Sequence, residues 1–188
     1  MDMYNIKWTR LQTEIFRFFC IKAGQILNLR GVAGHLKKSP TAVSKAILNL
    51  EKDGLLNLKR EKKMNLVSIE FNRDNKNAID LKRVENLKLI YESGLAEFLE
   101  ENFPGSTIIL FGSYSRGDDV FINTDEGHKS DIDIAIIGAK EKKIKLINFN
   151  QLLERTIILN FYPSLKEIHK NLKENILNGI LISGSVEL

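Results

Sequence analysis

Two short segments in the second half of the chain combine residue types that are suited to phosphate and metal chemistry. The first is Gly112-Ser113, which directly follows an apolar run, and the second consists of Asp131 and Asp133 at the start of another. Side chains at i and i+2 of a strand point to the same face, so the two aspartates are expected side by side. Neighbouring carboxylates repel unless a cation or a proton lies between them. Mg²⁺ (or Mn²⁺) suits this position, because hard cations prefer carboxylate and phosphate oxygens.

The Gly112-Ser113 turn predicts a phosphate site. A glycine at a strand-to-helix turn lets the backbone approach a ligand closely, and the N–H groups and the serine hydroxyl can donate to phosphate oxygens. A turn that holds a triphosphate, placed next to carboxylates that hold metal, is suited to phosphoryl or nucleotidyl transfer.

Together, the F-G-S-x-S-R-G segment (111–117) and the S-D-I-D-I segment (130–134) strongly resemble the nucleotidyltransferase superfamily of DNA polymerase β. Its minimal members, small proteins of prokaryotic toxin–antitoxin modules, are the most similar. The resemblance covers about residues 100–185. It implies a mixed β-sheet flanked by helices and the transfer of a nucleoside monophosphate from a nucleoside triphosphate with Mg²⁺. It also raises a partner protein of the toxin–antitoxin type.

The resemblance also implies a role for each matched residue. Gly112 and Ser113 would bind the phosphates, and Asp131 and Asp133 would bind the catalytic metals. Arg116 would neutralise phosphate charge or, as an equal alternative, form a salt bridge to the acidic loop that follows it.

One position departs from the family pattern. A third acidic residue is expected on a later strand, in the segment 156–163, and the residue that best matches it is Asn160. Asparagine can offer a carbonyl oxygen to a metal, but it cannot accept a proton as a base. The departure therefore affects catalysis more than nucleotide binding.

The N-terminal half shows a different pattern. Apolar residues at helical spacing predict helices over 8–23, 29–36 and 40–53, and the last of these has Ser39 as its N-cap. Two strands, 55–60 and 65–71, follow. This order is similar to a winged helix-turn-helix domain of the MarR or ArsR kind over about residues 8–72, and the segment 39–71 carries most of the resemblance.

A winged helix implies contact with double-stranded DNA. The predicted recognition helix offers Thr41, Ser44 and Lys45 to base edges or phosphates in a major groove. The predicted wing places four basic side chains along the flanking phosphates, namely Lys59, Arg60, Lys62 and Lys63. The alternative is a winged helix used for dimerisation or protein contact.

Charge is distributed unevenly between the two halves. Residues 1–76 hold 15 Lys and Arg against 7 Asp and Glu, although the net charge of the 188-residue chain is only +4. A basic half favours a polyanionic partner, because phosphates attract clustered cations. The single cysteine, and the lack of a long apolar run or a signal-like N-terminus, favour a cytoplasmic protein without membrane contact.

The sequence therefore predicts an α+β protein with a winged helix at 1–74, a linker helix at 75–103 and a nucleotidyltransferase domain at 104–188. The favoured function is nucleotidyl transfer by a DNA-bound enzyme. The alternative is a DNA-binding regulator whose nucleotidyltransferase domain is catalytically degenerate and serves as a nucleotide sensor or dimer module. A homodimer is expected, because winged helices often bind two-fold sites.

Overall fold

The computed structural model describes residues 8–61, 66–121 and 130–186. The chain separates into two compact units, Met1–Ala78 and Ile79–Leu188. In the part of the chain that is described, no helix is both long and apolar enough to cross a membrane.

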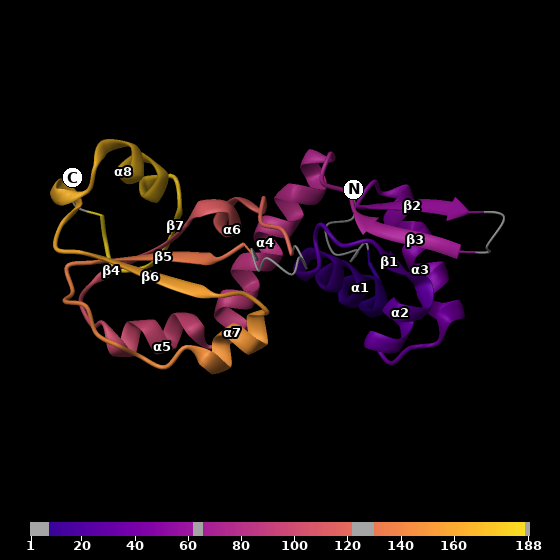
Figure 1. Ribbon diagram of the computed structural model, residues 1–188, viewed down its shortest axis with the longest axis horizontal. Helices are drawn as coiled ribbons and strands as arrows, with labels where there is room; N and C mark the ends of the chain where they lie inside the picture. The colour runs from indigo at the N-terminus through magenta and orange to yellow at the C-terminus, as the bar shows by residue number, and fades with distance from the viewer. Residues whose placement is uncertain (1–7, 62–65, 122–129, 187–188) are drawn as a thin grey trace, which may run out of the picture. The chain divides into compact units, whose positions relative to one another are not determined.

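Three helices build most of the first unit (Figure 1). They are α1 (Arg10–Ile21), α2 (Leu29–His35) and α3 (Pro40–Lys52). Helix α3 begins as its sequence predicts, because the Ser39 hydroxyl accepts a hydrogen bond from the Ala42 N–H (3.3 Å). The three predicted helices are thus confirmed, each to within about two residues.

A small antiparallel sheet completes the first unit. Its strands are β1 (Leu27–Asn28), β2 (Leu56–Glu61) and β3 (Leu66–Phe71), in the order β1-β3-β2. Strands β2 and β3 run side by side as a hairpin (Figure 1). Three helices followed by this hairpin form the expected winged helix-turn-helix.

The segment 75–103, which was predicted to hold a single helix, forms two helices in the structure. Helix α4 (Lys76–Glu92) stops before α5 (Leu95–Asn102), since Gly94 takes a left-handed conformation (φ +77°). Nothing lies within 4 Å of the Cβ that a side chain would add at Gly94, so backbone conformation and not a close contact explains this glycine. The ends of both helices pack on the sheet of the second unit, although 75–103 was expected to be a linker.

A four-stranded mixed sheet forms the centre of the second unit. Its strands are β4 (Thr107–Phe111), β5 (Ile132–Ile137), β6 (Ile157–Tyr162) and β7 (Ile180–Ser183), in the order β6-β5-β4-β7. Strand β4 is antiparallel to β5 and β7, whereas β5 and β6 are parallel. This sheet matches the expected nucleotidyltransferase architecture.

The remaining helices of the second unit are α6 (Gly112–Arg116), α7 (Ile147–Leu153), the 3-10 turn η1 (Leu165–Glu167) and α8 (Lys170–Leu177). The sequence predicts one helix from about Ser164, then Gly179 and a terminal apolar strand or extension; the structure divides the helical part into η1 and α8 and places strand β7 after Gly179. Gly179 lies so close to β4 that an added Cβ would come within 2.4 Å of the Leu110 carbonyl oxygen. The chain therefore leaves α8 and joins the sheet as β7.

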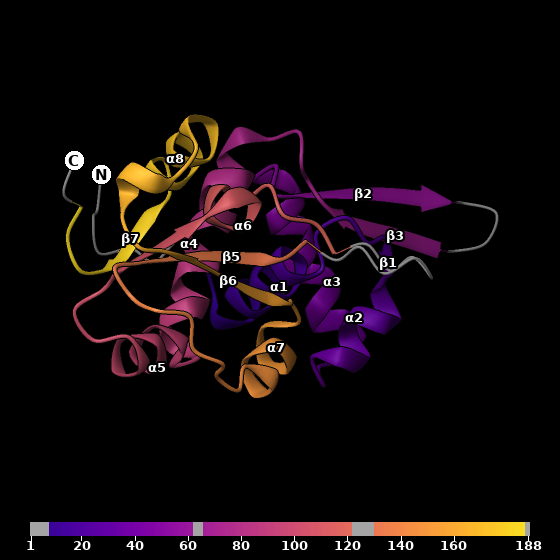
Figure 2. The same ribbon diagram turned by 60° about the vertical axis from the view of Figure 1, so that its left-hand side comes forward.

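The two faces of this sheet are covered by different helices. Helices α5 and α7 lie on one side and α8 on the other (Figures 1 and 2). Alternate residues of β5 divide accordingly: Ile134 packs toward the side of α5 and α7, and Ala135 toward the side of η1 and α8. Asp131 and Asp133 have the same parity as Ala135, so they belong to the α8 side, at the start of β5.

Candidate functional site

The structure brings the two predicted chemical segments together. Phe111 pairs with Asp133 across the β4–β5 ladder, so Gly112, the next residue, lies beside the Asp133 carboxylate. A Cβ at position 112 would come within 2.7 Å of Asp133 Oδ2, and Gly112 also has a positive φ of +76°. Both features require glycine here. The phosphate turn and the aspartate pair are therefore parts of one site.

The electrostatic surroundings of the aspartate pair are unfavourable for two negative charges. Burial, and then the negative charge of Asp131, raise the pKa of the Asp133 carboxyl above its usual value. Among the residues that the structure describes, no lysine or arginine forms an ion pair with either aspartate. A cation bound between the two carboxylates would reverse this unfavourable electrostatic situation.

The register of β5 and β6 determines which side chain stands next to the pair. Asp133 is paired with Ile158 on β6. Asn160 is on the same face of β6 but two residues further along the strand, where it is paired with Ala135. Neighbouring strands lie about 4.8 Å apart, so Ile158 is the β6 residue beside Asp133. Its side chain is apolar and 38% exposed. The family pattern pointed to Asn160 as the best match to a third acidic residue, but the strand pairing is not visible in the sequence.

The described residues of the site offer two carboxylates to a divalent cation. No group of three His, Cys, Asp or Glu side chains that could hold a metal occurs in the described residues. Two carboxylates, together with phosphate oxygens from a nucleotide, can supply the oxygen ligands of one Mg²⁺. Two-metal catalysis places ions about 3.5–4 Å apart and needs further ligands.

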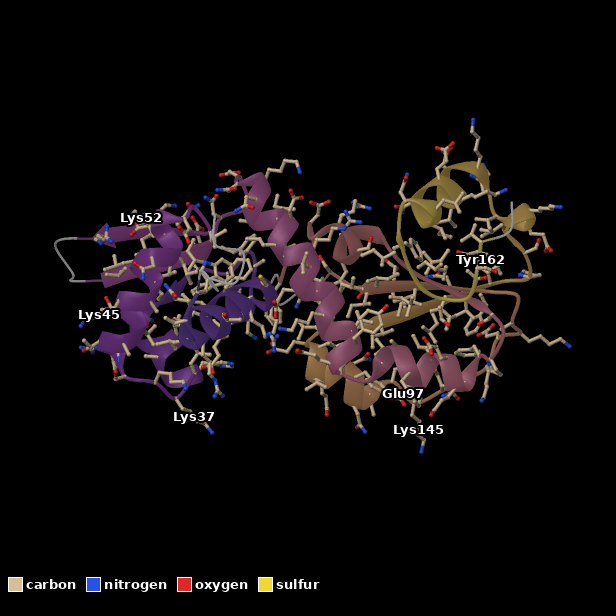
Figure 3. The ribbon with its side chains drawn as sticks, turned by 180° about the vertical axis from the view of Figure 1, so that it is seen from behind. Lys37, Lys45, Lys52, Glu97, Lys145 and Tyr162 are labelled. Atoms are coloured by element: carbon tan, nitrogen blue, oxygen red, sulfur yellow. The ribbon has the colours of Figure 1, made fainter. Side chains whose placement is uncertain are left out.

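Tyr162 is a member of this face that the sequence analysis did not identify. It follows Ile158 and Asn160 on the same face of β6, opposite Ile137 (Figure 3). Burial, and then the charge of Asp133, raise the pKa of the Tyr162 hydroxyl. The phenol therefore senses the same negative charge that a bound cation would neutralise.

Arg116 forms the contact that was its alternative assignment. Its Nε donates to Asp118 Oδ2 (3.0 Å), and Nη1 donates to Asn175 Oδ1 on α8 (3.2 Å). The side chain is about half exposed, so it can exchange these partners at little cost. Within the same turn, the Ser115 hydroxyl donates to the Gly112 carbonyl oxygen (2.9 Å) and fixes the backbone at the phosphate site.

A buried polar cluster supports the loop that follows the phosphate turn. Asp119 is only 1% exposed, and its carboxylate accepts from Lys82 Nζ, from Asn86 Nδ2 (2.8 Å) and from Arg155 Nη2 (2.9 Å). Asn86 Nδ2 also donates to the Tyr114 carbonyl oxygen (2.9 Å), which links α4 to α6. Asp119 is therefore a buried structural anchor of this acidic loop, whereas Asp118 is exposed and pairs with Arg116. The acidic residues at 125 and 126 lie outside the described residues.

The predicted DNA-contacting residues have different surroundings. Thr41 and Lys45 are exposed on α3, and Ser44 is partly exposed. On the wing, Lys59 Nζ lies 3.7 Å from Glu70 Oε1, and Arg60 Nη2 lies 3.1 Å from Glu51 Oε2. The two remaining predicted contacts, Lys62 and Lys63, lie outside the described residues.

Several solved structures are similar to about half of this chain. A point mutant of ZitR from Lactococcus lactis is 22% identical with a TM-score of 0.40, covering 53% of this chain and 64% of that one. The adhesin competence repressor AdcR from Streptococcus pyogenes is also 22% identical, with a TM-score of 0.40, covering 53% of this chain and 70% of that chain. A complex of S. aureus MepR with DNA is 14% identical, with a TM-score of 0.36 and coverage of 50% and 81%. The match thus spans less than two thirds of the ZitR chain.

Comparison with curated protein sequences found no match. The sequence model of the family described as polymerase beta, nucleotidyltransferase matches residues 93–186, which is half of the chain. This segment contains the phosphate turn, the aspartate pair and β6. The chain therefore belongs to the polymerase β nucleotidyltransferase family.

Proposed function

We propose that the second unit binds a nucleoside triphosphate with one divalent cation, and that the first unit binds double-stranded DNA. The protein would then act as a DNA-binding regulator that senses a nucleotide. The observation that carries this proposal is the arrangement around Asp133, which faces the Gly112 turn on one side and has the apolar Ile158 on the other.

Nucleotide binding is supported by the features that the site retains. Gly112 has no side chain where a phosphate must approach the backbone, and the Ser113 side chain is partly exposed beside it. Asp131 and Asp133 would hold the cation, which would screen the phosphate charge. Arg116 would add a positive charge after releasing Asp118.

Nucleotidyl transfer is the second candidate function. In this reaction an acceptor hydroxyl forms a bond to the α-phosphorus, pyrophosphate leaves, and a base takes the hydroxyl proton. The retained aspartate pair favours transfer, because an abandoned site has no need of two repelling carboxylates. The absence of a third acid beside Asp133 in the described residues argues against it, because Ile158 and Asn160 cannot accept that proton.

DNA binding is supported by the fold and charge of the first unit. A winged helix presents its third helix to a major groove, and α3 exposes Thr41 and Lys45. The surplus of basic residues in this half favours a polyanion. A homodimer on a two-fold DNA site belongs to this proposal, whereas no comparison supports a toxin–antitoxin partner.

Nucleotide binding can be tested by equilibrium dialysis of the full chain with each labelled nucleoside triphosphate and Mn²⁺. We expect metal-dependent binding that is lost in Asp131→Ala/Asp133→Ala. It should persist in Glu100→Ala/Glu101→Ala, a control that removes two carboxylates from the end of α5. Absence of binding by the wild type would refute the sensor. A nucleotide-dependent product in the same mixtures, lost in the Asp131/Asp133 variant, would instead establish transfer.

A further inference from the structure

Strand β6 lies at one edge of the four-stranded sheet, and it pairs with β5 on its inner side. The Ile132 N–H donates to the Thr156 carbonyl oxygen (2.8 Å), and the Gly138 N–H donates to the Tyr162 carbonyl oxygen (2.9 Å). In a parallel pair, these bonds fix the pattern for the whole strand. Even-numbered residues of β6 bond to β5, and odd-numbered residues direct their backbone N–H and C=O groups away from the sheet.

The outward-directed groups belong to Ile157, Leu159 and Phe161, which we call the β6 edge. The Ile157 N–H donates to Asn150 Oδ1 on α7 (3.1 Å), so this group has a partner. Wherever the structure describes the chain, nothing bonds to the backbone N–H or C=O groups of Leu159 and Phe161. A row of such groups is a template for pairing with a further strand.

The surface around the β6 edge is depleted of charge. Charged residues make up 28% of the chain, but the segment 146–163 contains only Glu154 and Arg155. Arg155 is buried, where it pairs with Asp119. Neither α7 nor β6 contains a charged residue. Edge strands are usually protected from association by charged side chains or by proline, and protein interfaces are depleted of charge at their centres. The composition of β6 therefore favours a strand that is covered by protein.

Large apolar side chains are exposed on both elements of this surface. Ile147 and Leu152 of α7 are 60% and 63% exposed, and Ile158 of β6 is 38% exposed. Helix α7 lies beside β6, since its Asn150 reaches the β6 edge (Figures 1 and 2). Nucleic acids and charged peptides find no opposite charge here. An uncharged partner with a free strand edge fits this surface, and a second copy of β6 supplies both features.

We propose that β6 pairs antiparallel with β6 of a second copy, about a two-fold axis at Leu159. An interface of this kind must be complementary to itself. With Leu159, the middle residue of the β6 edge, opposite its own copy, the two Leu159 residues exchange hydrogen bonds. The Phe161 N–H then donates to the Ile157 carbonyl oxygen of the partner subunit. The two sheets become one continuous sheet. This inference goes beyond the proposed function, because the pairing needs neither DNA nor nucleotide.

This register also brings a residue of the partner to the candidate site. Ile158 is opposite Asn160 of the partner subunit, and both side chains are on the α8 side of the joined sheet. Because Ile158 is paired with Asp133, the three residues form one row across three strands. Neighbouring strands are about 4.8 Å apart, so two strand spacings place the backbone of the partner's Asn160 about 10 Å from that of Asp133. Its amide borders a nucleotide bound at Asp133.

The register can be tested by cysteine cross-linking in the full chain. Opposite residues of a pair without hydrogen bonds are close enough for a disulfide. Ile158→Cys and Asn160→Cys are prepared separately, mixed to exchange subunits and oxidised. The mixture should give about fivefold or more cross-linked dimer than either variant alone, because only the mixture places two cysteines opposite each other. Leu181→Cys mixed with Ser183→Cys, the matched pair on the other edge strand, β7, should give no such excess. The native Cys20 is buried in every variant. Equal yields from mixed and unmixed β6 variants would overturn the register.

The interface itself can be tested by sedimentation of the full chain without DNA or nucleotide. The wild type should form a dimer. Asn160→Lys should weaken association about tenfold or more, because it brings a lysine from each copy into an uncharged edge. Asn171→Lys, the same substitution at an exposed position of α8, should leave association unchanged. Thermal unfolding confirms that both variants are folded. A wild type that stays monomeric, or a folded Asn160→Lys that associates as the wild type does, would overturn the proposal.

The contribution of the partner to the site can be tested by nucleotide dialysis at protein concentrations below and above the dimer dissociation constant. Nucleotide affinity should rise about threefold or more as the dimer forms, since one added hydrogen bond contributes about 0.5–1.5 kcal/mol. Equal affinity at all concentrations would show that Asn160 of the partner subunit does not contact the nucleotide. If no nucleotide binds, the sensor is refuted, and cross-linking and sedimentation still decide whether β6 forms the interface.

Discussion

The backbone of Gly112 lies against the carboxylate of Asp133, and an added Cβ at position 112 would come within 2.7 Å of Asp133 Oδ2. This contact joins the end of β4 to the start of β5. It brings the proposed phosphate and metal ligands of the protein into one site.

Replacing this glycine should damage both stability and ligand binding. Gly112→Ala places a Cβ within 2.7 Å of Asp133 Oδ2 and strains a backbone with φ +76°. The strain alone costs about 1–2 kcal/mol. Gly105→Ala is the matched control, because Gly105 also has a positive φ but nothing lies within 4 Å of its added Cβ. In urea unfolding and nucleotide dialysis, we expect both variants to lose stability and only Gly112→Ala to lose nucleotide affinity.

The pairing of Asp133 with Ile158 predicts where a third carboxylate would act. Ile158→Asp places an acid beside Asp133 and should increase Mn²⁺ affinity about tenfold or more, because carboxylates add ligands and charge. Asn160→Asp places the same acid one pair further along β6 and should have a smaller effect. Isothermal titration calorimetry with Mn²⁺ measures the metal affinity of both variants. If Asn160→Asp binds Mn²⁺ more tightly than Ile158→Asp, the strand register does not determine the metal site.

The same two variants also test how close the site is to catalysis. We expect Ile158→Asp to produce more nucleotide-dependent product with labelled triphosphates than either wild type or Asn160→Asp, because only that carboxylate lies next to the aspartate pair. Equal product from all three proteins would show that a missing acid is not what limits transfer.

The raised pKa of Asp133 predicts a pH-dependent stability cost. Because the carboxyl has a higher pKa in the folded protein than in the unfolded chain, its ionised form destabilises the fold at neutral pH. Asp133→Asn should therefore be more stable than wild type at pH 7 by up to about 1 kcal/mol, since the group is only partly buried. The difference should shrink as the pH falls through the raised pKa, where wild-type Asp133 becomes protonated.

Divalent cations provide the control for this measurement. Mn²⁺ should stabilise the wild type and leave Asp133→Asn almost unchanged, because ligand binding stabilises only the state that binds it. If Asp133→Asn were less stable than the wild type at pH 7 without metal, the ionised Asp133 carboxylate would not destabilise the fold.

Asp119 should contribute strongly to stability without contacting a ligand. Asp119→Asn leaves Lys82 and Arg155 buried without their shared carboxylate, and breaking a buried ion pair typically costs about 3–5 kcal/mol. Asp118→Asn is the adjacent control, because Asp118 is about half exposed and its pair with Arg116 should contribute at most about 1 kcal/mol. Chemical denaturation of the two variants gives the comparison. Similar free energies of unfolding would show that the buried cluster is not an anchor.

The sequence by itself determined most of the elements of this protein and the family of its second half. The Ser39 cap, the apolar spacing and the two strands that follow were sufficient to predict the winged helix. The Gly112-Ser113 turn and the two aspartates were sufficient to predict the nucleotidyltransferase family of the second half. These signals are local: caps, turns and the two-residue period of a strand depend on neighbours in the chain.

Only the tertiary structure decided which residues meet across the chain. The β5–β6 register placed Ile158, and not Asn160, beside Asp133. The pairing of β7 with β4 decided which strand the terminal segment joins. Asp119 became a buried anchor because α4 and the turn between α7 and β6 supply its partners from 37 and 36 residues away. Strand pairing and burial are set by packing between distant segments, and a single sequence carries no local signal for them.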